Sequence, residues 1–144
     1  MSQYADSSFL VSCYVVDANT PRAKRILFRI RAPLAFTDLH ALEVQNALQL
    51  GISRGHLSAA EAAAARANLQ RDLRSGRLVR TAMKWPVTFR FAARLSDRHS
   101  ATVGTRSLDI LHVAAAKALR ATEFVSFDAR QRTMAGAVGL KVAP

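Results

Sequence analysis

Of four candidate acidic side chains, three stand where the sequence predicts that helices or strands begin or end, and the fourth lies within a predicted helix. Asp6 follows a short opening segment, and Asp128 follows an apolar run at residues 124–127. Asp109 enters the first turn of a predicted helix, where the helix dipole favours a carboxylate. Glu43 lies within the helix predicted after residues 34–36. Because sites in parallel α/β proteins form outside the carboxyl ends of strands, these four acids are the candidate catalytic residues.

Such a group of carboxylates would need a cation. Two of them about 4 Å apart repel by about 4 kcal/mol at an effective dielectric constant near 20. Cys13 is the single cysteine, so neither a disulfide within the chain nor a CxxC knuckle is possible. Ligands that are all oxygen suit Mg²⁺ or Mn²⁺. Two such ions could activate a water and stabilise the departing oxygen in phosphodiester cleavage.

Each acid also has a purely structural interpretation. Asp6 and Asp128 could be helix N-caps, and Glu43 could lie on an exposed helix face. Asp109 lies in an apolar stretch, residues 108–111, that predicts burial, and an unpaired buried carboxylate is costly. The convergence of the four acids is therefore a hypothesis.

Two histidines lie near the candidate acids. His112 is one helical turn after Asp109, so it could orient that carboxylate; a buried, hydrogen-bonded histidine is the alternative. His40 lies three positions before Glu43, and we interpret it as a capping or surface residue rather than a metal ligand. Arg106, close to Asp109, is the arginine we select for phosphate contact or for capping the acidic site.

Helices and short strands alternate along the chain, which favours a parallel sheet covered on both sides. Thr20 before Pro21 is a predicted N-cap, and Ser58 with Glu61 matches the capping box. The periodicity of residues 9–16 fits a strand or a buried helix equally. Helices are predicted at residues 20–31, 39–50, 58–73, from 85 onward, at 108–119 and up to 136 or 139, and strands at 34–36, 78–81, 124–127 and 140–142.

Length and composition fit one compact domain over residues 1–144, with half of the residues hydrophobic. The net charge of +11 indicates a polyanionic partner, and arginines at 90, 94 and 98 and between residues 22 and 31 could track an RNA backbone or be solvated faces. No run of 18 apolar residues could span a bilayer, and the first residues lack a basic, then apolar, signal pattern. We expect a cytoplasmic protein.

Four segments occur in order along the chain: YADSSFL at residues 4–10, FTDLHALEVQNAL at 36–48, RSLDILHVAAA at 106–116 and FVSFD at 124–128. Together they resemble PIN-domain ribonucleases, and most closely the VapC toxins of bacterial type II toxin–antitoxin pairs. The likeness extends over nearly the whole chain, to GLKV at residues 139–142.

The resemblance implies a three-layer α/β/α sandwich with a mainly parallel central sheet, in which residues 9–16 form a helix. It implies a Mg²⁺- or Mn²⁺-dependent endoribonuclease, inhibited by a cognate antitoxin and forming a homodimer. Asp6 and Asp109 would be the principal metal ligands, and Glu43 and Asp128 would support metal, water or substrate. Ser126 falls where the family often has a small hydroxyl residue near the site.

Two other functions remain open. One is a basic nucleic-acid-binding regulator without catalysis, whose acids only cap helices. The other is a metal-dependent DNA nuclease of similar fold. The resemblance alone favours RNA, because nothing in the composition reports contact with a 2′-hydroxyl.

Overall fold

A computed structural model describes residues 2–144 of the chain. Its residues form two compact units. We call residues 2–6 with 82–144 the terminal unit, and residues 7–81 the internal unit. Within the described residues, no helix has the length and apolar character needed to cross a membrane.

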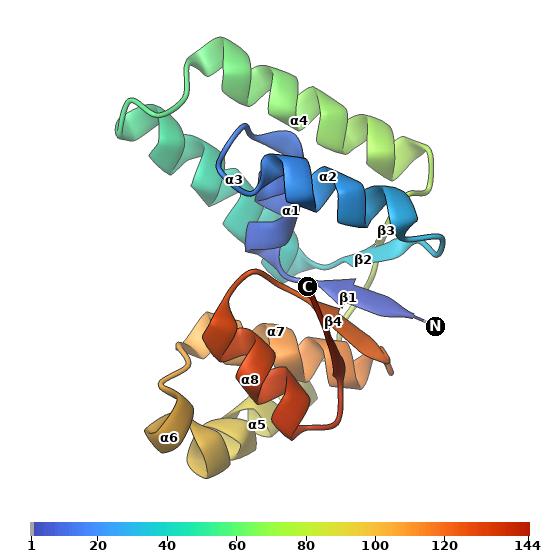
Figure 1. The fold of residues 1–144 in the computed structure, drawn as a ribbon, viewed down its shortest axis with the longest axis vertical. Helices are drawn as coiled ribbons and strands as arrows, with labels where there is room; N and C mark the ends of the chain where they lie inside the picture. Colours follow the sequence, from blue (N-terminus) through green and yellow to red (C-terminus); the bar gives the residue numbers. More distant parts are fainter. Residues whose placement is uncertain (1) are drawn as a thin grey trace. The chain divides into compact units, whose positions relative to one another are not determined.

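The terminal unit is built on a three-stranded parallel sheet (Figure 1). Its strands are β1 (Gln3–Ala5), β4 (Glu123–Val125) and β5 (Lys141–Ala143), in the order β1-β4-β5. Tyr4 pairs with Phe124, and their buried rings stack with centroids 5.9 Å apart. The apolar residues that predict the strand at 124–127 thus form the middle of the sheet.

Helices complete the terminal unit: α5 (Trp85–Leu95), the π-helix η1 (Ser96–Ser100), α6 (Ala101–Val103), α7 (Ser107–Ala118) and α8 (Ala129–Ala137). Seven consecutive residues of α7, from Ile110 to Ala116, are buried. Small alanines there let α5 and α8 pack against α7, while α8 also packs on β4 and β5. The helix predicted at residues 108–119 thus contributes a long buried segment to the core of this unit.

The internal unit holds four helices and a two-stranded parallel sheet. They are α1 (Ser7–Tyr14), α2 (Thr20–Arg29), β2 (Leu34–Phe36), α3 (Asp38–Ser53), α4 (Ala59–Arg74) and β3 (Leu78–Arg80). Residues 9–16 are therefore mostly helical, as the resemblance implies, and Phe9 and Leu10 are fully buried. Leu48, Ala62 and Ala65 join α3 and α4 in a small apolar cluster.

Capping fixes where two helices of the internal unit begin. Ser58 and Glu61 form the predicted box: the Glu61 N–H donates to Ser58 Oγ (3.0 Å) and the Ser58 N–H donates to Glu61 Oε2 (2.7 Å). Thr37 caps α3 in the same way, with His40 in place of the acid: the Thr37 N–H donates to His40 Nδ1 (3.0 Å). His40 is thus a buried capping residue.

Several expectations about local structure were wrong. The N-cap of α2 is Asn19, and Thr20 is the first helical residue: its Oγ1 accepts from the Asp17 N–H (2.8 Å) and donates to the Val15 carbonyl instead of capping the helix. β4 ends at Val125, so residues 126 and 127 leave the strand. Leu108 is 46% exposed, so the start of α7 is less buried than its apolar sequence predicts.

Candidate active site

Asp6 lies at the carboxyl end of β1. Its N–H donates to the Val125 carbonyl (3.0 Å), which continues the pairing of β1 with β4 and fixes the backbone of Asp6 beside the end of β4. The residue has no exposed surface. Its Oδ2 accepts a hydrogen bond from Ser126 Oγ (2.8 Å). A buried carboxylate is thus held at the edge of the sheet by the residue that follows β4.

The Ser126 hydroxyl also connects Asp6 to Asp128. Ser126 Oγ accepts a hydrogen bond from the Asp128 N–H (3.0 Å), and Asp128 Oδ1 accepts from the Gln131 N–H (2.9 Å). Asp128 is therefore the N-cap of α8, as its structural interpretation predicts. The guanidinium of Arg132 donates to the carbonyls of Ser126 and Phe127 (both 3.1 Å), which holds this loop.

Asp109 lies in the first turn of α7, and both of its carboxylate oxygens have partners. Oδ2 accepts from Arg106 Nε (3.1 Å), and Oδ1 accepts from Gln131 Nε2 (2.8 Å). The side chain of Asp109 is 14% exposed, whereas that of Arg106 is 77% exposed. Asp109 is therefore paired and partly exposed rather than deeply buried. Arg106 caps the acidic site, one of the two roles that its position suggests.

Gln131 is the site residue that the sequence analysis missed. Asp128 and Gln131 have the spacing of a capping box, in which the glutamine side chain turns back to the N-cap N–H. Here that N–H already bonds Ser126, so the Gln131 amide reaches α7 and Asp109 instead. The pattern Asp-x-x-Gln was visible in the sequence, but the partner of its side chain depends on tertiary packing.

Hydrogen bonds therefore link three of the predicted acids, Asp6, Asp109 and Asp128, within the terminal unit. Glu43 is half-buried on α3 and belongs to the internal unit. Its role with the other three stays a prediction.

His112 is buried one turn beyond Asp109. Its Nδ1 lies 2.8 Å from the hydroxyl of Tyr4. The centroids of the two rings are 5.8 Å apart. This is the hydrogen-bonded core histidine of the structural interpretation. It ties α7 to β1, the strand that ends at Asp6.

The donor set suits a hard cation that keeps most of its own water. Within residues 2–144, no three His, Cys, Asp or Glu side chains gather closely enough to hold a metal by themselves. Mg²⁺ is commonly held by only one or two carboxylates, with waters and substrate phosphate as its other ligands. Asp6 and Asp109 would supply that number of carboxylates. The buried Oε1 of Gln131, which has no partner among the described residues, adds an acceptor for a hydrogen-bond donor such as water.

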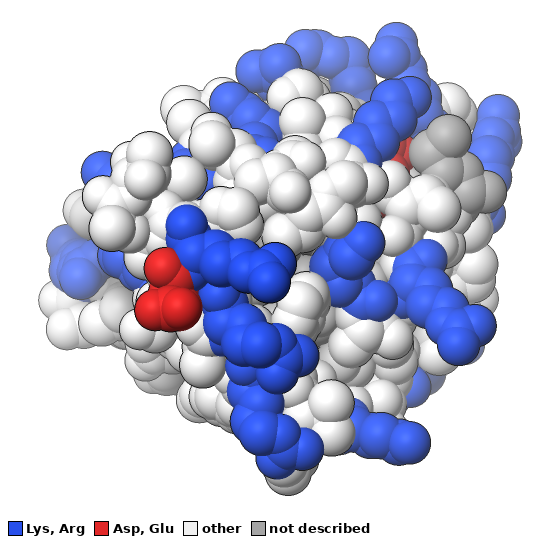
Figure 2. Space-filling view, turned by 90° about the horizontal axis from the view of Figure 1, so that it is seen from below, with Lys and Arg blue, Asp and Glu red and all other residues white. Residues whose placement is uncertain are grey.

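On the face drawn in Figure 2, blue Lys and Arg atoms far exceed red Asp and Glu atoms. Arg90, Arg94 and Arg98 of α5 and η1 are exposed, as predicted. Arg94 also lies over the ring of Phe91, 5.5 Å from its centroid. Such exposed cations can contact phosphates without reading sequence.

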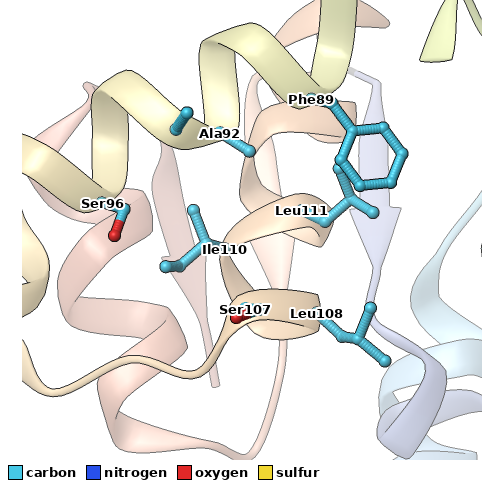
Figure 3. Close-up of a pocket in the computed structure, with 8 residues that line it drawn as sticks. Phe89, Ala92, Ser96, Ser107, Leu108, Ile110 and Leu111 are labelled. Atoms are coloured by element: carbon cyan, nitrogen blue, oxygen red, sulfur yellow. The ribbon is translucent and has the colours of Figure 1, made fainter. Parts of the chain in front are cut away.

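A pocket of about 280 Å³ lies between α5 and α7 of the terminal unit, with Ser96 of η1 at its lining. Figure 3 shows it lined mainly by apolar side chains, among them Phe89, Leu108 and Leu111. None of the predicted acids contributes to its lining, so this pocket is separate from the acidic site.

Parallel strands that end in linked carboxylates define an α/β protein with an acidic site at the sheet edge. The family model for the PIN domain matches residues 4–137, and the chain belongs to this family. Its fold is the predicted three-layer α/β/α sandwich with a parallel central sheet.

Two solved structures share this fold. One is VapC20 from Mycobacterium tuberculosis, described as a sarcin-ricin loop cleaving toxin, at 20% identity and a TM-score of 0.67, covering 99% of this chain and 100% of that chain. The other is FitAcB from Neisseria gonorrhoeae, at 13% identity and a TM-score of 0.63, covering 99% of this chain and 96% of that one. No curated protein matches the chain.

Proposed function

We propose that the protein is a metal-dependent endoribonuclease that acts in the cytoplasm as the toxin of a toxin–antitoxin pair. The observation that carries this proposal is the linked set of Asp6, Ser126, Asp128 and Asp109 at the ends of parallel strands and helices, in a chain of the PIN domain family. The fold shared with VapC20, a toxin described as cleaving the sarcin-ricin loop, favours RNA as the substrate and toxicity as the biological role. We treat residues 1–144 as one nuclease domain, which the family match over residues 4–137 supports.

In this proposal, Asp6 and Asp109 hold Mg²⁺ or Mn²⁺, and Glu43 and Asp128 support the ion, the water or the substrate. A bound divalent ion lowers the pKa of water and offsets charge on phosphate. Ser126 fixes Asp6 by its hydrogen bond. Arg106, whose side chain is 77% exposed, would contact a phosphate oxygen of the substrate. Water adds to phosphorus, the bond to the departing sugar oxygen breaks, and that oxygen receives a proton.

The test compares cleavage of RNA by the wild type and by Asp6→Asn and Asp109→Asn, in protein freed of any antitoxin. Each substitution removes a negative charge at nearly constant volume, so we expect cleavage with Mg²⁺ or Mn²⁺ to fall at least a hundredfold while circular dichroism is unchanged. Asp17→Asn, which alters an acid of the internal unit, is the matched control and should cleave normally. Equal cleavage by all four proteins would remove the assignment of these acids.

A matched DNA oligonucleotide separates the ribonuclease from a DNA nuclease of the same fold. The second candidate function, a regulator that binds nucleic acid without cutting it, is favoured by the net charge of +11 and by the capping role of Asp128. It predicts RNA binding that is indifferent to divalent ions, with no cleavage at any metal concentration.

The proposed partners are a cognate antitoxin and a second copy of the chain. If expression of the protein alone stops growth and the product of a neighbouring gene relieves the arrest, the toxin role is supported. Sedimentation of the purified protein tests the homodimer.

A further inference from the structure

The amide of Gln131 makes a contact that helix capping does not explain. Its Nε2 donates to Asp109 Oδ1 (2.8 Å), joining α8 to the first turn of α7. The residue is 3% exposed, and its own N–H is held by Asp128. A buried side chain on a capped helix is a rigid support for the carboxylate that it touches.

Hydrogen-bond chemistry determines which end of the Gln131 amide faces Asp109. If the amide were turned over, its Oε1 would face a carboxylate oxygen, and two acceptors would repel. Nε2 must therefore point at Asp109. Oε1 is left buried, without a partner among the described residues, which favours the approach of a hydrogen-bond donor.

The two partners of Asp109 differ in charge and in exposure. Gln131 is neutral and buried, so it orients the carboxylate without cancelling its negative charge. Arg106 is cationic, and its side chain is 77% exposed. It can therefore move away from the Asp109 carboxylate into solvent without burying its own charge. A cation approaching Asp109 would be repelled by Arg106 but not by Gln131.

We propose that Gln131 is a positioning residue that orients Asp109 toward a divalent cation, and that Arg106 is an exchangeable counter-charge that competes with this cation. The inference rests on the proposed function, because it takes Asp109 as a metal ligand. It assigns opposite effects to the two neighbours: loss of Gln131 weakens metal binding, and loss of Arg106 strengthens it.

The test measures Mn²⁺ binding without RNA, by electron paramagnetic resonance of the free aqueous ion during titration. Gln131→Met keeps the length of the side chain and removes the amide, and we expect its Mn²⁺ affinity to fall about 10- to 100-fold. Gln131→Asn, which keeps an amide but is one methylene too short, should weaken binding similarly. Thr133→Val is the matched control on the same helix, because its exposed hydroxyl bonds only the Ala129 carbonyl, and it should bind like the wild type.

Arg106→Gln gives the opposite arm of the experiment, with an expected severalfold gain in Mn²⁺ affinity. Because Arg106 is exposed, this variant keeps the inference testable even if the Gln131 variants fold poorly by circular dichroism. Folded Gln131 variants that bind Mn²⁺ within twofold of the wild type would overturn the positioning role while the proposed function stands. Weaker Mn²⁺ binding by Arg106→Gln would contradict the proposal that Arg106 competes with the cation for Asp109. A wild-type protein that cuts RNA without binding Mn²⁺ would overturn the proposed function as well.

Discussion

The buried hydroxyl of Ser126 serves two neighbours at once, donating to Asp6 and accepting from the N–H of Asp128. Ser126→Ala removes both hydrogen bonds inside a closed site. We expect the free energy of unfolding to fall by about 1–3 kcal/mol, because polar groups are left with fewer partners. We also expect RNA cleavage to fall at least tenfold, because Asp6 loses the donor that fixes it. Chemical denaturation and a cleavage assay measure the two effects.

Ser12→Ala is the matched control for this prediction. Ser12 is also buried and donates to an aspartate, Asp17 Oδ2 (2.7 Å), but it lies in the internal unit. The Ser12→Ala protein should show a fall in the free energy of unfolding comparable to that of Ser126→Ala, and it should cleave RNA at the wild-type rate. If both variants lost cleavage equally, the effect of Ser126 would be one of stability alone.

The thiol of Cys13 is free and buried in the internal unit. Removal from water raises the pKa of its thiol from 9.0 to about 12, against a smaller opposite effect of Arg77. Burial, together with a hydrogen bond to Asp72, also raises the pKa of the Tyr14 hydroxyl. Both groups bind their proton more tightly in the folded state than in the unfolded state. The stability that Cys13 contributes is therefore complete below about pH 9 and is lost as the pH rises from 9 toward 12. The contribution of Tyr14 begins to be lost only above its ordinary pKa of 10.0.

We accordingly predict that the free energy of unfolding, measured in urea, falls as the pH rises above 9. Iodoacetamide should leave Cys13 unmodified in the native protein at pH 8 and modify it in urea, as mass spectrometry would show. Rapid alkylation of the native protein would contradict the burial of this thiol. Cys13→Ala should reduce the loss of stability above pH 9.

The sequence predicted the chemistry of individual residues better than their contacts. The types and positions of Asp6, Asp109 and Asp128 singled them out, and hydrogen bonds link all three. Gln131 was missed because nothing in the neighbouring sequence indicates that this uncharged helix residue contacts the Asp109 carboxylate. The partial exposure of Asp109 was missed because it depends on what packs beside the start of α7.

At the scale of elements, reciprocal hydrogen bonds at the capping box fix the beginning of α4. Ser58→Ala leaves the Glu61 N–H without its side-chain partner, and we expect the free energy of unfolding to fall by about 1 kcal/mol. Ser53→Ala, at the exposed end of α3, is the control and should have a smaller effect. A thermal melt monitored by circular dichroism measures both. No loss in Ser58→Ala would show that helix packing alone fixes this boundary.

The start of α4 was predicted closely, because both partners of its capping box lie within one helical turn, whereas the lone hydroxyl of Thr20 did not mark the cap of α2. α4 begins directly after Ser58, as its box predicts. The π-helix η1 was not predicted, since its five polar residues carry no periodic pattern. The end of β4 was placed two residues too late: the Ser126 N–H still donates to the Ala143 carbonyl (2.9 Å), but the Ser126 side chain bonds Asp6 and Asp128 in the loop that follows the strand.

At the scale of the whole molecule, the net charge of +11 should make RNA binding strongly dependent on salt. For single strands, the slope of log affinity against log salt is about −0.7 for each phosphate contacted. If Arg90, Arg94 and Arg98 each contact a phosphate, replacing all three with glutamine should make the slope shallower by about 2. Filter binding with the Asp6→Asn background avoids cleavage during the measurement.

Arg54→Gln, an exposed arginine that follows α3, is the control for this experiment. This substitution removes one positive charge from a position outside the set Arg90, Arg94 and Arg98. An unchanged slope in the triple variant would assign those arginines to solvated faces, the alternative interpretation of their spacing.

Fold class was predictable because the alternation of helices and strands, together with four family-like segments, points to one architecture. The division into two units was not predictable from the sequence, because it depends on which helices pack together rather than on any change in composition. The role of Glu43 depends on the same long-range arrangement, and so the sequence could propose it only by resemblance.

The order of strands in the terminal unit has a consequence for how the protein is made. β4 lies between β1 and β5, and Gln3 pairs with Glu123, a partner about 120 positions later in the chain. During synthesis, Asp6 is made early but must wait for Ser126, 120 residues later, and for Asp128. A nascent chain is therefore unable to assemble its acidic centre until these residues have left the ribosome. Any activity that depends on this centre is withheld from the growing chain until then.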